Sequence, residues 1–334
     1  MNVIKILSAA WEITRRRRDL WFFGFLTAML GSPMLVNAFL TPPMSKNALQ
    51  NIPTNAMPMA GWQPPTFWRK VMLGMDSHTA TYVALWFALA TLAMMTIFYV
   101  LFVAGEAALF HALLADPHGE PPSLRSQWAE AHPFFWRLFF FPLPAGLLFG
   151  IAVVGLGAFA AALTLSMGAL GILLLIPLFL LAFLGGWLLT IYFRLGAGAI
   201  VLEGLPFWEA LDRPWRLWKQ HFWVVLLMGL VLEVILWVAS TVLFYITSLF
   251  MLGLSVLLEG VAPTLVPWFI AHPAILLTAG TLLMLGGKTL LAFALAPVMT
   301  WVITAWGLTY LALLGRWPAP DTAAYASAAP QNTA

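Results

Sequence analysis

Charged side chains are scarce in this chain of 334 residues, of which only 9% are charged and 62% are hydrophobic. A soluble domain carries about 25% charged residues, because its surface must face water. The scarcity of charge therefore excludes a water-soluble globule of this size. The chain also has no cysteine, which excludes disulfide bonds and thiolate metal sites.

Signatures of catalysis and of cofactor binding are missing as well. No HExxH or other metal-ligand spacing occurs, and no G-x-S-x-G, Walker loop or G-x-G-x-x-G stands in a strand–helix context. The basic residues flank apolar runs instead of forming a basic domain, so we expect no nucleic-acid partner. We expect no catalytic residue, no metal site and no cofactor.

Long apolar runs are what the sequence does contain, and several reach the roughly 20 residues that a helix needs to cross a bilayer core. The fold class we predict is all-α: a polytopic membrane helical bundle, with six transmembrane helices as three tandem hairpins joined by cytoplasmic interfacial helices. The expected helices cover 20–40, 79–114, 136–165, 168–194, 222–252 and 274–314. The second is longer than a bilayer core, so its end, with Glu106 and His111, should project out.

The remaining segments are expected outside the bilayer core, and together they divide the chain into three parts. Residues 1–19 have apolar side chains at helical spacing and predict a cytoplasmic interfacial amphipathic helix. The six-helix transmembrane domain follows over 20–316, and 317–334 form a disordered cytoplasmic tail. Within the domain, prolines mark 41–78 as a connector, 115–132 as a polar loop and 253–273 as an outside loop or re-entrant segment.

Paired tryptophans next to basic residues precede three of the apolar runs. These tryptophans are the expected interfacial anchors: Trp11, Trp21, Trp128, Trp136, Trp215 and Trp223. Tryptophan is enriched at the headgroup level of a membrane. Each pair therefore indicates where one hairpin enters the bilayer.

The placement of lysine and arginine predicts the topology. With the amino terminus inside, the loops on the outside hold only Lys46, Arg69 and Lys70 among the 16 basic residues. This asymmetry predicts a cytoplasmic (inner) membrane protein with both termini in the cytoplasm. The basic residues expected to fix topology and to face lipid headgroups are Arg15, Arg16, Arg17, Arg18, Arg213, Arg216 and Lys219. The bilayer itself, with its anionic lipids, is the first partner we expect.

Two stretches of the sequence resemble a known group of proteins. The first is Ala10-Trp11, the basic run from Arg15 to Arg18, and the following L-W-x-F-G-F-L ending at Leu26. The second is G-x-x-x-x-E-A-L-x-R-x-W from Gly204 to Trp215, followed by Phe222-Trp223. Together they resemble bacterial multi-pass proteins that include the membrane domain of glycerophosphoryl diester phosphodiesterases and the YciC-like inner-membrane proteins. The resemblance implies a six-helix integral membrane domain. No phosphodiesterase domain is present, so that activity is not carried over.

Among the polar residues inside the expected helices, four are candidates for a functional role: Glu233, Ser240, Thr241 and Lys288. Glu233 lies 11 residues past Phe222, which places it about 16 Å into its helix. A carboxylate at that depth usually faces a bundle interior or a cavity. It could serve as a proton or cation relay, or as a protonated structural group. We expect Lys288 to extend to the outer interface; an ion pair with Glu233 is the alternative.

Two classes of function fit these features. The first is a non-enzymatic scaffold or accessory component that binds lipid, other membrane proteins or a second copy of itself. A stripe of small residues, Gly146, Gly150, Gly157 and Ala161, would let another helix approach closely. The second is a small transporter or permease in which Glu233 lines a polar path. An enzyme acting on lipid is disfavoured, because no nucleophile and base stand together in the sequence.

Overall fold

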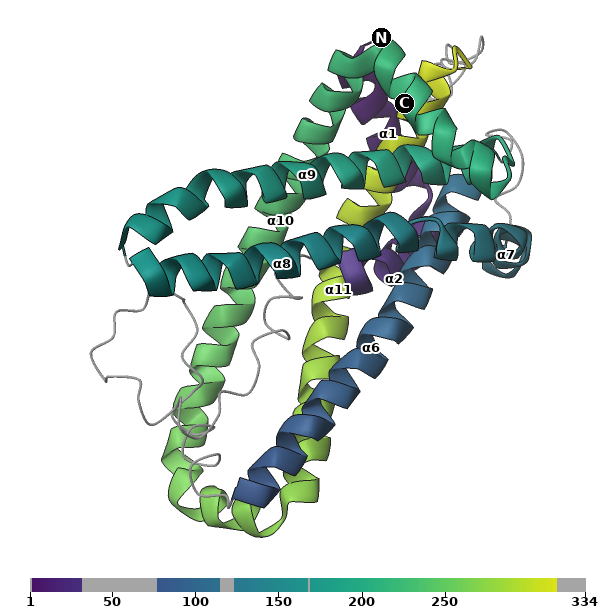
Figure 1. Ribbon diagram of the computed structural model, residues 1–334. Helices are drawn as coiled ribbons and strands as arrows, with labels where there is room; N and C mark the ends of the chain where they lie inside the picture. The colour runs from purple at the N-terminus through teal and green to yellow at the C-terminus, as the bar shows by residue number, and fades with distance from the viewer. Residues whose placement is uncertain (1, 32–76, 115–122, 168, 317–334) are drawn as a thin grey trace. The chain divides into compact units, whose positions relative to one another are not determined.

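The computed structural model describes residues 2–31, 77–114, 123–167 and 169–316 (Figure 1). Within these ranges the regular structure is entirely helical. The helices are α1 (Val3–Arg16), the 3-10 turn η1 (Arg18–Leu20), α2 (Trp21–Gly31), α6 (Ser77–His111), α7 (Leu124–Phe140), α8 (Leu143–Met167), α9 (Ala169–Leu202), α10 (Phe207–Ala271) and α11 (Pro273–Leu313).

Five stretches of the described chain are long and apolar enough to cross a membrane: Ala88–His111, Leu124–Ala160, Leu175–Leu202, Phe207–Leu243 and Leu285–Leu313. The all-helical class and the membrane-spanning character are therefore confirmed. The remaining expected helix is the first in the chain, over 20–40, and of it the structure describes only the part up to the end of α2 at Gly31. The count of six helices and their pairing as three hairpins stay predictions. The connector at 41–78, apart from its last two residues, and the tail at 317–334 lie outside the described residues.

The chain divides into two compact units. The first contains Met1–Gly24, Val103–Ile235 and Pro297–Ala334, and the second contains Phe25–Phe102 and Leu236–Ala296. Helices α6, α10 and α11 each contribute residues to both units.

Glycines allow close helix contacts in the first unit. A Cβ atom on Gly229 of α10 would lie 2.4 Å from the Ile191 side chain of α9. A Cβ atom on Gly307 of α11 would lie 2.1 Å from Leu113, just past the end of α6. Neither distance is possible for a real side chain, so these helices approach as closely as they do because glycine has no Cβ atom.

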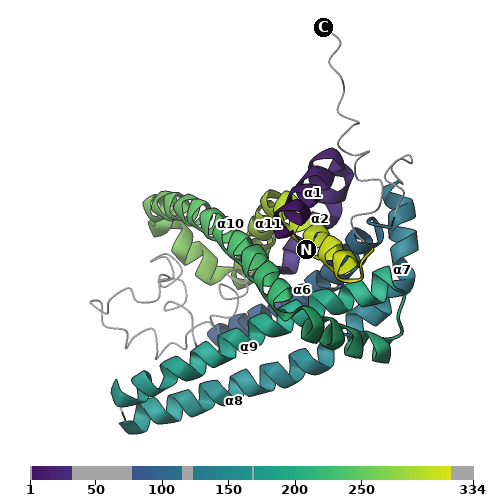
Figure 2. The same ribbon diagram turned by 90° about the horizontal axis from the view of Figure 1, so that it is seen from above.

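A hairpin of α8 and α9 lies in the first unit, with its two helices side by side (Figures 1 and 2). The Phe149 ring of α8 packs where Gly186 of α9 leaves space, 3.1 Å from the position of a Cβ atom. Large apolar side chains of both helices stay exposed, including Leu148, Val154 and Phe183. Such surfaces are stable against hydrocarbon chains and not against water.

Two expected loops are helical. Residues 253–273 do not form a loop, because α10 continues to Ala271 and α11 begins at Pro273. Proline is well suited to the first position of a helix, where its missing N–H costs nothing. The loop expected at 115–132 is also wrong for its described part, because α7 begins at Leu124. Ser123 caps this helix, and its Oγ accepts from the Ser126 N–H at 3.2 Å.

The entry of α10 follows the sequence more closely. The helix carries one residue with non-helical backbone angles, His221 (φ −130°, ψ 35°). This kink separates the segment 207–220, which contains most of the charged residues of the helix, from the apolar run that begins at Phe222. The chain therefore changes direction where the sequence predicts that it enters the bilayer.

Candidate functional site

An ion pair joins α6 to α9 inside the first unit. Arg194 Nη1 lies 2.5 Å from Glu106 Oε1, and only 11% and 10% of the two side chains are exposed. Glu106 is therefore enclosed by protein, and the projection of this end of α6 from the bilayer core stays a prediction. Placing a carboxylate and a guanidinium in such a poorly solvated place is costly unless they pair, which explains why they are found together.

Glu233 of α10 is a second carboxylate on which the charge of Arg194 acts. The Glu233 side chain is half-buried, and the positive charge of Arg194 acts on it electrostatically. Of the four polar residues expected inside the bilayer, Glu233 is the one that belongs to this unit.

A second group, which we call the Tyr310 cluster, contains Glu203, Arg213 and Tyr310. Arg213 donates from Nε and Nη2 to the two oxygens of Glu203, at 3.0 and 3.1 Å. The Tyr310 hydroxyl donates to the same carboxylate. Two parallel hydrogen bonds fix both the distance and the orientation of an arginine and a carboxylate. The cluster therefore fixes the end of α9, the start of α10 and the end of α11 to one another.

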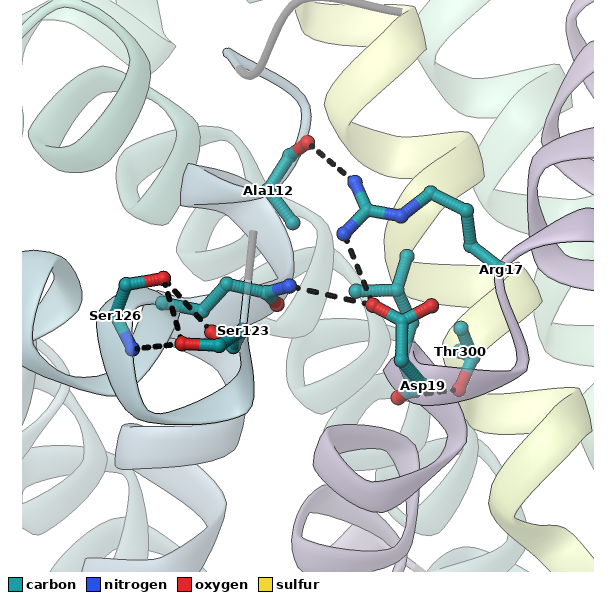
Figure 3. A network of polar contacts seen from close by, with 8 residues as sticks. Arg17, Asp19, Ala112, Ser123, Ser126 and Thr300 are labelled. Carbon is teal, nitrogen blue, oxygen red and sulfur yellow. Dashed lines mark hydrogen bonds and ion pairs between the residues drawn. The ribbon is translucent and has the colours of Figure 1, made fainter. Parts of the chain in front are cut away.

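A third group holds the amino-terminal segment, as Figure 3 shows. Asp19 of η1 accepts from Arg17 Nη2 at 3.0 Å and from Gln127 Nε2 of α7 at 3.2 Å. Arg17 Nη1 also donates to the Ala112 carbonyl at 3.4 Å. The Thr300 hydroxyl of α11 donates to the Leu20 carbonyl at 3.3 Å. These bonds join η1 to α7, α11 and the end of α6.

Helix α1 is packed on protein along one face. Ile6 and Ala10 are fully buried, and Trp301 Nε1 donates to the Leu7 carbonyl at 3.0 Å. The Trp11 and Trp301 rings meet edge to face at 6.1 Å. Burial of its apolar face against α11 gives this amphipathic helix a fixed place in the unit. The opposite face carries Lys5, Glu12 and the arginines that follow.

The expected tryptophan anchors lie at or near the surface. Trp11, Trp128, Trp136, Trp215 and Trp223 are exposed, and Trp21 is half-buried with its Nε1 donating to the Thr14 carbonyl at 2.9 Å. Trp128 also stacks on Phe23 with ring centroids 6.3 Å apart. Exposed tryptophan rings are what an interfacial role requires, and this role stays a prediction.

All seven basic residues expected to face headgroups also have neighbours within the protein, and their headgroup role stays a prediction. Carboxylates pair with Arg15, Arg16, Arg17, Arg213 and Arg216. Arg18 lies over the Trp21 ring and Lys219 over the Trp215 ring. The Arg16 guanidinium, through its hydrogen bond to Glu12, holds the pKa of that carboxyl group below its usual value. The partners of these basic residues could not be predicted from composition.

The other three intramembrane polar residues belong to the second unit. Ser240 is buried and Thr241 half-buried, and among the described residues their hydroxyl oxygens have no hydrogen-bond partner. Lys288 is 2% exposed, with its Nζ 4.4 Å from the centre of the Phe98 ring. The expectation that Lys288 reaches the outer interface is therefore wrong, because the aromatic ring attracts the ammonium group inside the unit. Pairing with Glu233, which belongs to the first unit, stays a prediction.

No protein-family model, curated protein or solved structure matches this chain. Any functional role must therefore be argued from the geometry. In the part of the chain that the structure describes, no group of three His, Cys, Asp or Glu residues could hold a metal ion.

Sequence reasoning missed the residues that form these groups, above all Glu106, Arg194, Glu203, Tyr310 and Asp19. One signal was available. Arg194 is the first charged residue after Arg137, and Glu106 is likewise the first after an uncharged run that begins at Thr79. A lone charge at the end of a long apolar run needs a partner of opposite charge at the same depth.

Proposed function

We propose that this chain is a non-enzymatic scaffold or accessory component of the bacterial inner membrane, with both termini in the cytoplasm. In this role a rigid helical frame presents apolar surfaces to lipid and to other membrane helices. The partner could be another membrane protein or a second copy of the chain.

The observation that carries the proposal is the α8–α9 hairpin. A Cβ atom added at Gly146, Gly150 or Gly157 would meet no atom within 4 Å. The small-residue stripe of α8 thus has no partner among the described residues, and Val154 next to it is 73% exposed. Small residues along one side of a transmembrane helix allow a second helix to approach closely. This is the surface an accessory subunit would offer.

The buried charges support a structural role over a catalytic one. Two ion pairs join different helices: Glu106 pairs with Arg194, and Glu203 pairs with Arg213. Catalysis at a headgroup would instead need convergent titratable groups that reach the substrate. Charges used to hold helices together serve a frame that keeps its shape.

Photocross-linking in cells tests the proposal. A photoreactive amino acid at position 154 should give discrete cross-links to protein, either to a second copy or to another membrane protein. Gly150→Leu, one helical turn away on the same side, should fill the stripe and abolish these cross-links. Gly155→Leu is the matched control, because it also lies in open space but faces another direction. Adducts to lipid alone, or cross-links that persist in Gly150→Leu, would contradict a helix-binding role.

A small transporter is the second candidate, and the position of Glu233 favours it. Glu233 is half-buried within an apolar helix, and the charge of Arg194 acts on it. A carboxylate inside a transmembrane segment commonly marks an ion or proton path. Proton flux into dye-loaded liposomes that contain the purified chain distinguishes the candidates. A transporter predicts flux that Glu233→Gln abolishes and that Glu209→Gln, an exposed carboxylate of the same helix, preserves. The scaffold predicts no flux above that of empty liposomes.

A further inference from the structure

Arg137, near the end of α7, differs from most basic residues of the first unit. It is exposed, and its only partner among the described residues is the Gly204 carbonyl, which accepts from Nη1 at 3.2 Å. A guanidinium carries five N–H donors. The bond to Gly204 therefore orients the group and leaves the other donors available to a ligand.

The turn that receives this bond is well defined. Gly204 has φ +70°, a conformation that glycine adopts without strain, and it connects α9 to the start of α10. The adjacent Glu203 belongs to the Tyr310 cluster, so its side chain is held in place. Arg137 is thus positioned against a fixed segment of backbone.

A shallow, open groove of about 440 Å³ lies beside Arg137, and its lining is almost entirely apolar. Its lining residues are Trp136, Arg137 and Phe140 of α7 and Phe207 and Trp208 of α10; we call it the Arg137 groove. Trp136 and Phe140 stack with ring centroids 5.9 Å apart, and Phe207 and Trp208 meet edge to face at 5.1 Å. The groove therefore has two aromatic walls, and Arg137, the charged residue of its lining, lies at its edge.

The sequence around the groove places it at the edge of the bilayer. From Leu138 to Phe193 the chain contains no Asp, Glu, Lys or Arg, so Arg137 is the last charge before a long apolar stretch. Trp208, on the α10 side of the groove, is 78% exposed, so its ring is accessible from outside the protein. Aromatic rings beside an arginine at this depth match the two parts of a phospholipid, since the rings contact acyl chains and the guanidinium contacts the phosphate.

We propose that the Arg137 groove binds one phospholipid with an anionic headgroup. The phosphate lies against the free donors of Arg137, and the upper parts of the acyl chains lie along the four aromatic rings. Charge complementarity selects an anionic lipid over a zwitterionic one. The inference deepens the proposed scaffold role, because it names the lipid class and the place where the frame would hold it.

Native mass spectrometry of the purified full chain, in detergent with equal amounts of phosphatidylglycerol and phosphatidylcholine, tests this site. The wild type should retain phosphatidylglycerol in preference to phosphatidylcholine. Arg137→Gln should weaken phosphatidylglycerol binding about fivefold, the factor expected for one basic residue near an anionic surface. Arg125→Gln is the matched control. It removes the same charge from an exposed position of α7, about 18 Å along the helix from Arg137.

The aromatic walls have their own test. Trp208→Ala should weaken the binding of both lipids, whereas Trp223→Ala, an equally exposed tryptophan of α10 outside the groove, should not. Glycerol 3-phosphate, which has the charge without the acyl chains, should not compete. If Arg137→Gln fails to fold, Arg137→Lys and Trp208→Ala carry the test: the lysine variant should keep the preference for phosphatidylglycerol with reduced affinity.

Three results would overturn the proposal: equal retention of the two lipids by the wild type, equal losses in Arg137→Gln and Arg125→Gln, or displacement of lipid by glycerol 3-phosphate. The first two would reduce binding to diffuse surface charge, and the third would indicate a site for a soluble phosphate. None of them bears on the cross-links from position 154, so failure of this site and failure of the scaffold role can be told apart.

Discussion

Replacement of Arg194 by methionine is the perturbation whose size follows most directly from the structure. It removes the cation from a pair in which both side chains are about nine-tenths buried, and leaves Glu106 without its partner. Breaking a buried ion pair in this way costs about 3–5 kcal/mol. For a cooperative unit of this size each kcal/mol lowers Tm by about 2–4 °C, so we expect a decrease of about 6–20 °C.

The assay is thermal unfolding of the purified protein in detergent, followed by circular dichroism. Arg216→Met is the matched control, because the pair of Arg216 with Asp212 is more than half exposed and should contribute about 0–1 kcal/mol. The double variant Glu106→Leu/Arg194→Met should recover much of the loss, since no buried charge is then left unpaired. A double variant that loses the sum of both single effects, or an Arg194→Met protein as stable as Arg216→Met, would refute the reasoning.

Three further predictions concern packing, hydrogen bonding and pH. Gly198→Ala should destabilise the protein by about 1–3 kcal/mol, because its Cβ atom would lie 2.8 Å from the Tyr310 ring. Gly155→Ala, in open space, should be neutral or stabilising. The Tm values of the two variants check this. Tyr310→Phe removes the hydroxyl that donates within the Tyr310 cluster and should cost about 1–3 kcal/mol in the same assay. The pair of Glu12 with Arg16 holds the folded pKa of Glu12 below 4.5, so its stabilisation should be present above that pH and be lost as the pH falls below it. The Tm difference between wild type and Glu12→Gln should then disappear in acid, and a difference that grows in acid would contradict this sign.

The lengths of apolar runs predicted the helices well where hydropathy alone decides. Helix α6 begins at Ser77 against an expected start at 79, and α11 ends at Leu313 against an expected end at 314. The prediction failed where prolines suggested a loop, at 253–273. Pro273 takes the first position of α11, where its missing N–H costs nothing, and Pro263 and Pro267 are accommodated within α10.

The candidate site could be predicted only in part. Glu233 and Lys288 were identified as polar residues inside helices, because a charge in an apolar run is visible in the sequence. The contacts between helices were not predicted, since Glu106 and Arg194 are 88 residues apart and Glu203 and Tyr310 are 107 apart. Pairing at such separations depends on which helices are neighbours, and neither hydropathy nor the spacing of tryptophans specifies that.

The central claim is that this polypeptide folds with a bilayer as its solvent and keeps both ends in the cytoplasm. The natural absence of cysteine allows a direct measurement. Single cysteines at Ser8, Ser45 and Ser327 report on the amino terminus, the first connector and the tail, and intact cells are treated with a maleimide that cannot cross the membrane. The account predicts labelling at position 45 alone, with positions 8 and 327 reacting only after the cells are opened. Labelling of position 8 or 327 in intact cells would contradict it.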